Sequence, residues 1–253
     1  MTDLSGTRAL VTAAGAGIGR RVAERLREAG AAVYACDVDE TGLDGLAPEI
    51  GRTVCDVSDE AQVEALFTSA DAALGGLDLV VCCAGTAGPI APLADTEPAA
   101  WRACVDVNLI GGYLCAREAV PRLTAAGGGG IIFFSSTSGL AGYPTRTAYC
   151  AAKHGLIGLV RALATEVGPG GITVNAICPG IVEGERMERV IDAEAAARGV
   201  APAAVRDGYA SGNSLKTWIT ADDLAETVLF LAGPGGAKIT GQALVVDGHT
   251  ESK

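Results

Sequence analysis

Three residues near the middle of the chain have the types and the spacing that acid–base chemistry requires. Tyr149 and Lys153 are four positions apart within 147–167, a segment whose pattern predicts a helix, so both side chains project from one face. A neighbouring ammonium favours the phenolate form of a tyrosine, which can then exchange a proton with a substrate hydroxyl. Ser136 follows the predicted strand 131–134, and its hydroxyl can bind a carbonyl or alkoxide oxygen. Without that context, a Tyr-x-x-x-Lys pair is typical of many helix surfaces.

A glycine-rich segment near the N-terminus predicts a phosphate-binding turn. A short apolar strand, 8–12, leads into Thr12–Gly19, and a helix follows to Ala29. Glycines allow the backbone to approach a pyrophosphate, and the N–H groups of the new helix point at it. Glycine-rich turns are common, so the prediction depends on the strand before the turn and the helix after it.

Asp37 ends the second predicted strand, 32–36, and lies 18 residues after Gly19. A carboxylate there can accept hydrogen bonds from the ribose hydroxyls of an adenine dinucleotide and would repel a 2′-phosphate. The next residue is Val38 rather than a basic one, and the turn contains Ala16. These residues favour NAD over NADP. The alternative for Asp37 is an ordinary solvated carboxylate at the end of a strand.

Short apolar runs alternate with helical segments along the whole chain, which predicts an α/β fold. We expect a doubly wound, Rossmann-type domain over residues 1–253, with a seven-stranded parallel sheet and helices on both faces. A charged, alanine-rich stretch, 183–213, contains no strand and is predicted to form a helical lid over the site. The remaining strands are expected at 53–55, 77–82, 131–134, 172–177 and 242–246. Further helices are expected at 59–74, capped by Ser58, at 98–108 and at 112–125.

Composition excludes several classes of function. The formal net charge of −11 argues against nucleic acid, whose phosphates would be repelled. Eight cysteines occur without a CxxC pair, and there are two histidines, so no zinc spacing is present. We expect eight free thiols in a reducing cytoplasm, no bound metal and no membrane-spanning segment.

Taken together, these motifs resemble those of the short-chain dehydrogenase/reductase family over essentially the whole chain. Each motif is modest, but their joint order and spacing are highly specific. The matching residues are Thr12–Gly19, Asp37, Asp56-Val57, Ala84-Gly85, Asn108, Ser136, Tyr149, Lys153, Cys178-Pro179-Gly180, Ile239–Gln242 and Asp247-Gly248.

The resemblance implies a role for each matching residue. Tyr149 would exchange the proton, Lys153 would favour its phenolate form and hold the nicotinamide ribose, and Ser136 would orient the substrate oxygen. Asn108 would hold a water that relays protons from Lys153. The residues implied to bind the cofactor are Thr12, Ala14, Gly15, Gly17, Ile18, Gly19, Asp37, Val38, Asp56, Val57, Cys83, Ala84, Gly85, Tyr149, Lys153, Pro179, Gly180 and Val182. The residues expected to contact substrate are Ser136, Ser138, Tyr143, Tyr149 and Met187.

Three positions depart from the family pattern. Ala13 stands where the family has its first glycine, so a methyl group could crowd the turn. Cys82-Cys83 replaces an asparagine pair whose amide normally ties strands together. Ile181–Gly184 offers no threonine near the expected position of the carboxamide.

The activity expected from this resemblance is hydride transfer between a secondary alcohol and NAD, giving the ketone. A sugar or polyol, a cyclic alcohol, a hydroxysteroid and a hydroxy acid are all open as substrates. Two alternatives remain: a 3-oxoacyl thioester reductase of the same family, and a catalytically silent NAD-binding protein. The resemblance also implies a homotetramer, formed through helices near 112–126 and 147–167 and the C-terminal strand.

Overall fold

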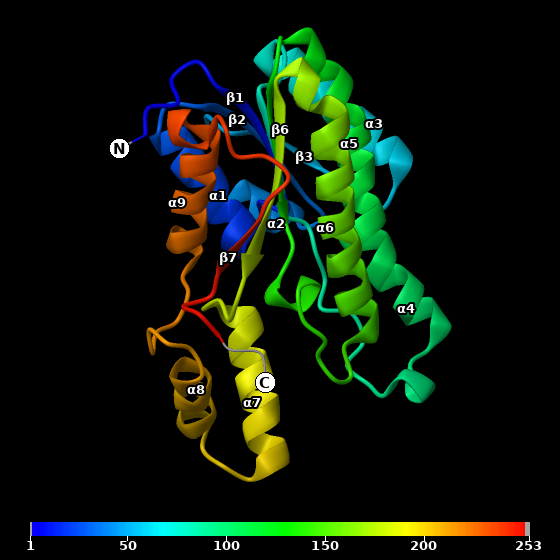
Figure 1. Ribbon diagram of the computed structural model, residues 1–253, viewed down its shortest axis with the longest axis vertical. Helices are drawn as coiled ribbons and strands as arrows, with labels where there is room; N and C mark the ends of the chain where they lie inside the picture. Colours follow the sequence, from blue (N-terminus) through cyan, green and yellow to red (C-terminus); the bar gives the residue numbers. More distant parts are fainter. Residues whose placement is uncertain (1, 251–253) are drawn as a thin grey trace.

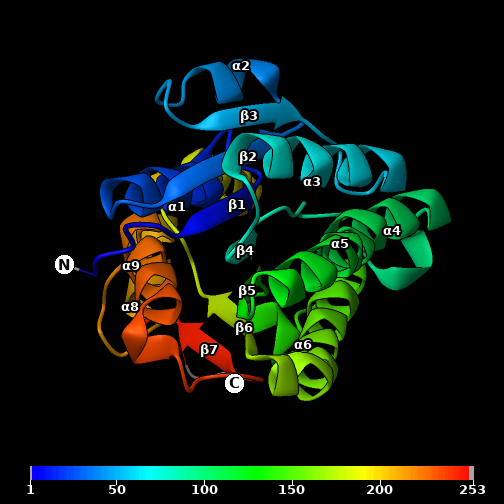
Figure 2. The same cartoon turned by 90° about the horizontal axis from the view of Figure 1, so that it is seen from above.

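A seven-stranded parallel sheet forms the centre of the molecule, as predicted. The computed structural model describes residues 2–250, apart from the side chains at positions 186, 193, 194, 197 and 198, so both ends of the predicted domain lie outside the described residues. The strands are nearly all apolar because helices cover both faces of the sheet (Figures 1 and 2). They are β1 (Arg8–Thr12), β2 (Ala32–Asp37), β3 (Gly51–Val54), β4 (Leu79–Cys82), β5 (Gly129–Phe134), β6 (Ile172–Pro179) and β7 (Ala243–Val246).

The strand order places a crevice between β1 and β4. The order across the sheet is β3-β2-β1-β4-β5-β6-β7, so the chain winds outward in one direction from β1 and in the other from β4. Val11 of β1 is paired with Ala35 on one side and with Val81 on the other. In such sheets the ligand binds outside the carboxyl ends of the strands at the point where the order reverses.

Two groups of helices cover the sheet. In Figure 2, α1 and α9 lie on one face, with α3, α5 and α6 on the other, and each face has its own buried apolar cluster. The helices are α1 (Gly17–Glu28), α2 (Glu40–Asp44), α3 (Glu60–Leu74), α4 (Pro98–Val105), α5 (Gly111–Ala125), α6 (Thr147–Val167), α7 (Glu185–Arg198), α8 (Pro202–Ser211) and α9 (Ala221–Ala232).

Several predicted boundaries were wrong. The third strand is Gly51–Val54 rather than 53–55, and Asp59, not Ser58, caps α3 by accepting a hydrogen bond from Gln62 N–H. The helix predicted over 98–108 ends at Val105, where a π-helical turn, Asp106–Ile110, joins it directly to α5.

Helix α9 is not among the helices that periodicity predicted. Its start carries a capping box, because Thr220 Oγ1 accepts from Asp223 N–H while Asp223 Oδ2 accepts from Thr220 N–H. The sequence Thr-x-x-Asp before an apolar run was the local signal for this helix. Helix α2, which has five residues, was also not predicted.

The predicted lid is a pair of helices outside the sheet. Helices α7 and α8 extend beyond the carboxyl ends of the strands (Figure 1). Ile191, Ala195 and Val205 form a small apolar cluster between them, separate from the two main clusters. Trp218 packs on this cluster, with the centre of its ring 6.3 Å from that of Tyr209.

One ion pair joins the starts of β1 and β4. Arg8 donates from Nε and Nη2 to the two carboxylate oxygens of Asp78, each at 2.8 Å, and its backbone N–H also donates to Asp78. The Arg8 guanidinium holds the pKa of the Asp78 carboxyl below its ordinary value, with burial acting in the opposite direction. The charged form of Asp78 therefore stabilises the folded sheet.

We expect Asp78→Asn to lower the free energy of unfolding by about 1–2 kcal/mol at pH 7, since the pair is partly exposed. Because the folded-state pKa is depressed, the stabilisation is present above the unfolded-state value near 4 and is lost as the pH falls through the folded-state value. The difference between parent and variant should therefore shrink from pH 7 to pH 3.5 in denaturant titrations. Asp95→Asn, at an exposed position, is the control; an unchanged difference at low pH would contradict the prediction.

Candidate active site

The turn after β1 has the open backbone that a bound phosphate needs. Gly17 has φ +54°, and a Cβ added to it would meet nothing within 4 Å, so its outer side is open. At Gly19 a Cβ would lie 2.1 Å from the Ala13 carbonyl oxygen, which makes glycine necessary where helix and turn touch. The first turn of α1 contains no acidic residue and its N-cap, Ala16, makes no side-chain cap. Its N–H groups thus fit the pyrophosphate of a dinucleotide.

Ala13, which stands where the family pattern has a glycine, adopts a strained backbone conformation. Its φ is +54°, in the left-handed region that disfavours residues with a Cβ. The methyl group is accommodated by backbone strain, while Ala14 is fully buried and donates its N–H to Cys36 O at 2.9 Å.

Ala13→Gly should therefore stabilise the protein, by about 1 kcal/mol, because relief of left-handed strain exceeds the entropy that glycine adds to the unfolded chain. Thermal melting of the two proteins measures this difference. Ala16→Gly is the matched control, since Ala16 has φ −151° and gains nothing from glycine. A destabilised Ala13→Gly variant would show that the methyl group makes a compensating contact.

Asp37 lies at the end of β2 and holds the glycine-rich turn. One carboxylate oxygen accepts from Gly15 N–H at 2.9 Å, and the other accepts from Asp39 N–H at 3.0 Å. Each oxygen keeps a further lone pair for a ligand hydroxyl. Val38, beside it, is 65% exposed and offers an apolar surface at the same edge.

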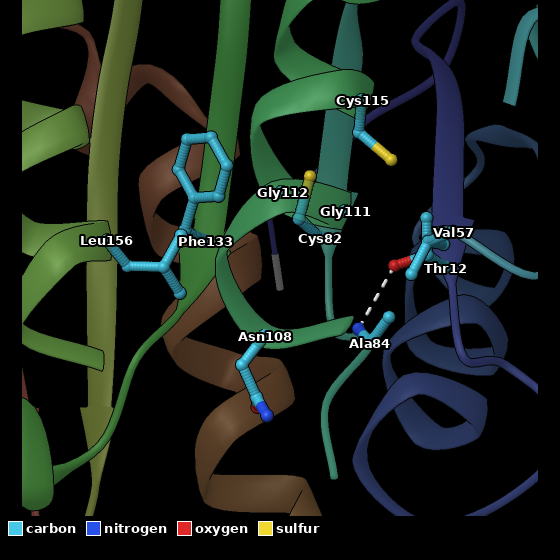
Figure 3. A pocket seen from close by; sticks show the side chains of 10 residues that line it. All are labelled: Thr12, Val57, Cys82, Ala84, Asn108, Gly111, Gly112, Cys115, Phe133 and Leu156. Atoms are coloured by element: carbon cyan, nitrogen blue, oxygen red, sulfur yellow. Dashed lines mark hydrogen bonds between the residues drawn. The ribbon is translucent and has the colours of Figure 1, made fainter. Parts of the chain in front are cut away.

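Thr12 links β1 to the segment after β4. Its buried hydroxyl accepts from the backbone N–H of Cys83, at 3.0 Å, and from that of Ala84, at 3.1 Å, and Figure 3 shows the second of these bonds. The end of β1 is thereby joined to the segment after β4. Burial raises the pKa of the Cys83 thiol, opposed in part by the Lys153 ammonium, so Cys83 is a neutral thiol here rather than a nucleophile.

Asn108 lies in the π-helical turn between α4 and α5 and is buried. Its Nδ2 donates to Cys104 O at 2.8 Å and to Thr86 O at 3.0 Å. Its Oδ1 is shut off from solvent without a hydrogen-bond partner among the described residues. Figure 3 shows the amide projecting away from the sulfur atoms of Cys82 and Cys115. A buried carbonyl oxygen without a donor fits a site for an ordered water.

Lys153 is buried and faces the same space as Asn108. Its Nζ donates to Phe134 O, at the end of β5, at 2.8 Å. A Cβ built on Gly85 would lie 2.8 Å from Asn108 Oδ1 and 3.3 Å from Lys153 Nζ, so both polar groups border the space beside Gly85. Lys153 Nζ is also 5.6 Å from the centre of the Tyr149 ring. The predicted helical spacing thus brings the cation to the phenol.

Ser136 follows β5 at the carboxyl edge of the sheet, and its Oγ accepts from Ser138 N–H at 3.1 Å. Ser135, next to it, is buried and donates to Lys153 O at 2.9 Å, which ties this edge to α6. The hydroxyl proton of Ser136 remains available to a substrate oxygen. Ser138 is half-buried, and Tyr143 is 40% exposed on the loop that leads to α6.

The residues predicted to bind the adenine and nicotinamide sides of a cofactor follow β3 and β6 at the carboxyl edge of the sheet. Asp56 Oδ1 accepts from the N–H and the hydroxyl of Ser58, whereas Val57 is buried with its side chain and its carbonyl oxygen both beside Gly111. Gly180 has no room for a side chain, since a Cβ would lie 2.5 Å from Asp247 Cβ.

Three further predicted contacts are placed as follows. Pro179 is buried at the end of β6. Val182 forms a β-bridge with Ile219, and Ile18 packs on the cluster beneath α1.

An open pocket of about 830 Å³ lies near the predicted site, and of the five residues predicted to contact substrate only Tyr143 lines it. Tyr143 and Leu140 line it from the loop before α6, and Leu215 and Trp218 line it from the segment after the lid. Met187 lies elsewhere, packed on the small cluster between the lid helices. Its contact with substrate stays a prediction.

Arg146 was not among the predicted site residues, although it lies one turn before Tyr149. Its guanidinium carbon is 4.7 Å from the centre of the Tyr149 ring. An arginine at this distance stacks on the aromatic face. The only signal in the sequence was a basic residue three positions before the tyrosine.

Other features bear on the classes considered above. All eight cysteines lie within the described residues as free thiols, seven of them buried. No helix between residues 2 and 250 is long and apolar enough to cross a bilayer. Over the same part of the chain, no group of three His, Cys, Asp or Glu side chains is placed to hold a metal ion.

Comparison with known proteins extends over nearly the whole chain. A family model described as enoyl-(acyl carrier protein) reductase matches residues 12–249. The chain is 36% identical over 249 residues to a cis-4-hydroxycyclohexanecarboxylate dehydrogenase from Sinomonas cyclohexanicum, covering 95% of this chain and 94% of the relative. It is 33% identical to a D-beta-hydroxybutyrate dehydrogenase from Rhizobium meliloti, covering 95% and 96%. A crystal structure of an actinorhodin polyketide ketoreductase with NADPH superposes with a TM-score of 0.91, at 32% identity and 98% coverage of both chains.

Proposed function

The chain belongs to the short-chain dehydrogenase/reductase family, and from this premise we propose that it oxidises a secondary alcohol to a ketone with NAD. The observation that supports the proposal is the position of Lys153 Nζ, which lies 5.6 Å from the centre of the Tyr149 ring and donates to Phe134 O at the end of β5, just before Ser136. Asp37 and the glycine-rich turn follow β2 and β1 at the same edge of the sheet. A dinucleotide bound at this edge would accept the hydride from the carbinol carbon. The protein supplies position and proton transfer.

The proton leaves the substrate through Tyr149. The phenolate oxygen takes the hydroxyl proton as the carbon–hydrogen bond breaks, while the Ser136 hydroxyl binds the same substrate oxygen and holds it in place. The Lys153 ammonium favours the phenolate and would also bind the nicotinamide ribose. A water accepted by Asn108 Oδ1, beside Gly85, would pass the proton from Lys153 toward solvent. In the reductive direction each transfer runs backward.

NAD is proposed over NADP on the position of Asp37. A 2′-phosphate would lie beside a carboxylate already held in place by two backbone N–H groups, with exposed Val38 in place of a compensating cation. We propose that the other residues named in the sequence analysis as cofactor contacts also bind the NAD.

We also propose that the protein is a homotetramer in the cytoplasm. Free cysteines support the compartment, and the exposed side chains of Tyr113 and Val245, on the predicted interface elements, support the assembly.

Reduction of a 3-oxoacyl thioester is the second candidate, favoured by the similarity to a ketoreductase crystallised with NADPH. The same tyrosine, lysine and serine would serve that reaction with the proton moving in the opposite direction. Asp37 argues against it, since it disfavours the 2′-phosphate of that cofactor.

The test is absorbance at 340 nm with a panel of polyols, cyclic alcohols and hydroxy acids, each with NAD and with NADP. We expect reduction of NAD by at least one alcohol. Reaction with NADP alone would overturn the cofactor proposal, and oxidation of NADPH by a 3-oxoacyl thioester would favour the second candidate. NADH binding by calorimetry without turnover of any substrate would indicate a catalytically silent binding protein.

A further inference from the structure

A guanidinium lies directly over the ring of the proposed acid–base residue. Arg146 is the N-cap residue of α6, and its Cζ is 4.7 Å from the centre of the Tyr149 ring. Its Nη2 donates to Ala87 O at 3.3 Å, in the segment that follows β4. Arg146 therefore joins the start of α6 to the segment after β4, beside the ring of Tyr149.

The charge of Arg146 has no anionic partner among the described residues. No described carboxylate lies within 4.0 Å of the Arg146 guanidinium, unlike those of Arg8 and Arg122, although Arg27 and Arg52 share this lack among the described residues. Its Nε is shut off from solvent without a hydrogen-bond acceptor in the part of the chain that the structure describes. What sets Arg146 apart is its place over the ring of Tyr149, where a ligand that supplies the anion would also meet the reacting groups.

We propose that Arg146 binds the carboxylate of the substrate, and hence that the alcohol oxidised here is a hydroxy acid. This inference rests on the proposed function. Arginine presents a planar fork of donors that matches a carboxylate, and stacking on Tyr149 holds the fork in one orientation. A substrate whose carboxylate lies a few carbons from its hydroxyl reaches both Arg146 and Tyr149. Because the chain as a whole repels anions, the local cation decides whether such a substrate binds.

Matched pairs of substrates separate this role from a general effect on Tyr149. The pairs are 3-hydroxybutyrate with its methyl ester, and cis-4-hydroxycyclohexanecarboxylate with its methyl ester. We expect the parent to prefer the acid of at least one pair. Arg146→Gln should lower kcat/KM for that acid about 30- to 100-fold and change that for the ester by less than about threefold. Arg146→Lys, which keeps the charge, should recover part of the loss.

A binding measurement keeps the test independent of turnover. Calorimetry with NADH present should detect cyclohexanecarboxylate or butyrate binding to the parent, weaker binding of the corresponding amides, and loss of the carboxylate preference in Arg146→Gln. Arg161→Gln is the matched control, because Arg161 is exposed on the same helix and the change in charge is identical. The control should bind carboxylates as the parent does.

Several outcomes would overturn the proposal. If Arg146→Gln lowered kcat/KM equally for the acid and the ester, Arg146 would only position Tyr149. If the parent protein showed no preference for the acid over the ester, a carboxylate would not be the ligand of Arg146. If the parent preferred a hydroxyalkyl phosphate to the hydroxy acid, the anion bound by Arg146 would be a phosphate and the hydroxy-acid proposal would be wrong. Turnover of neutral alcohols with no carboxylate binding refutes this inference alone, whereas absence of turnover with every alcohol counts against the proposed function.

Discussion

Tyr149→Phe should lower kcat/KM for alcohol oxidation by about 10³-fold, the largest effect expected of any single substitution in this chain. The substitution removes only the hydroxyl that exchanges the proton. The ring that contacts the Arg146 guanidinium and lies 5.6 Å from Lys153 Nζ is kept, so the walls of the site are preserved. Initial rates at 340 nm, with the best alcohol from the panel, measure the loss.

Two controls show whether the loss is chemical. NADH binding by Tyr149→Phe, followed by fluorescence, should stay within a few-fold of the parent, since every other predicted cofactor contact is retained. Tyr113→Phe removes a hydroxyl from an exposed position on α5 and should leave the rate unchanged. If Tyr149→Phe kept more than about a tenth of the parent activity, another group would have to carry the proton.

Asp37→Asn should reduce the preference for NAD over NADP by about 10²-fold or more, because it removes the charge that opposes a 2′-phosphate. Asparagine retains an oxygen that can accept from Gly15 N–H, the contact that Asp37 makes at 2.9 Å, so the glycine-rich turn should keep its shape. The ratio of kcat/KM for the two cofactors, measured with one alcohol, reports the change. Adding Val38→Arg, at the exposed neighbouring position, should move the preference further toward NADP.

The control for Asp37 is Asp39→Asn, an exposed position at the same edge with the same change in charge. This variant should change the ratio of kcat/KM for NAD to that for NADP by less than about twofold, since solvent and salt screen an exposed charge that does not contact the cofactor. A parent that prefers NADP, or an Asp37→Asn variant with an unaltered ratio, would remove Asp37 from cofactor selection and strengthen the 3-oxoacyl thioester candidate.

Features that depend on neighbours in the chain were predictable from the sequence. The sheet, the glycine-rich turn and the shared face of Tyr149 and Lys153 follow from apolar runs, glycine positions and the repeat of an α-helix, all of which act within a few residues. The helical lid at 183–213 was also predictable, because a strand-free, alanine-rich stretch has few other ways to order. The conformational cost of Ala13 was foreseen as crowding, and the structure expresses it as a positive φ.

Features that depend on distant contacts were decided by the tertiary structure alone. The bond from Cys83 N–H to the Thr12 hydroxyl joins residues 71 positions apart, and no local pattern records it. The π-helical turn that directs Asn108 toward Lys153, and the stacking of Arg146 on Tyr149, arise only when α4, α6 and the segment after β4 pack together. Sequence alone determined which residues could move a proton and bind a dinucleotide. Packing between elements far apart in the chain determined which of them meet, and left Arg146 as a cation with no described anion beside the reacting groups.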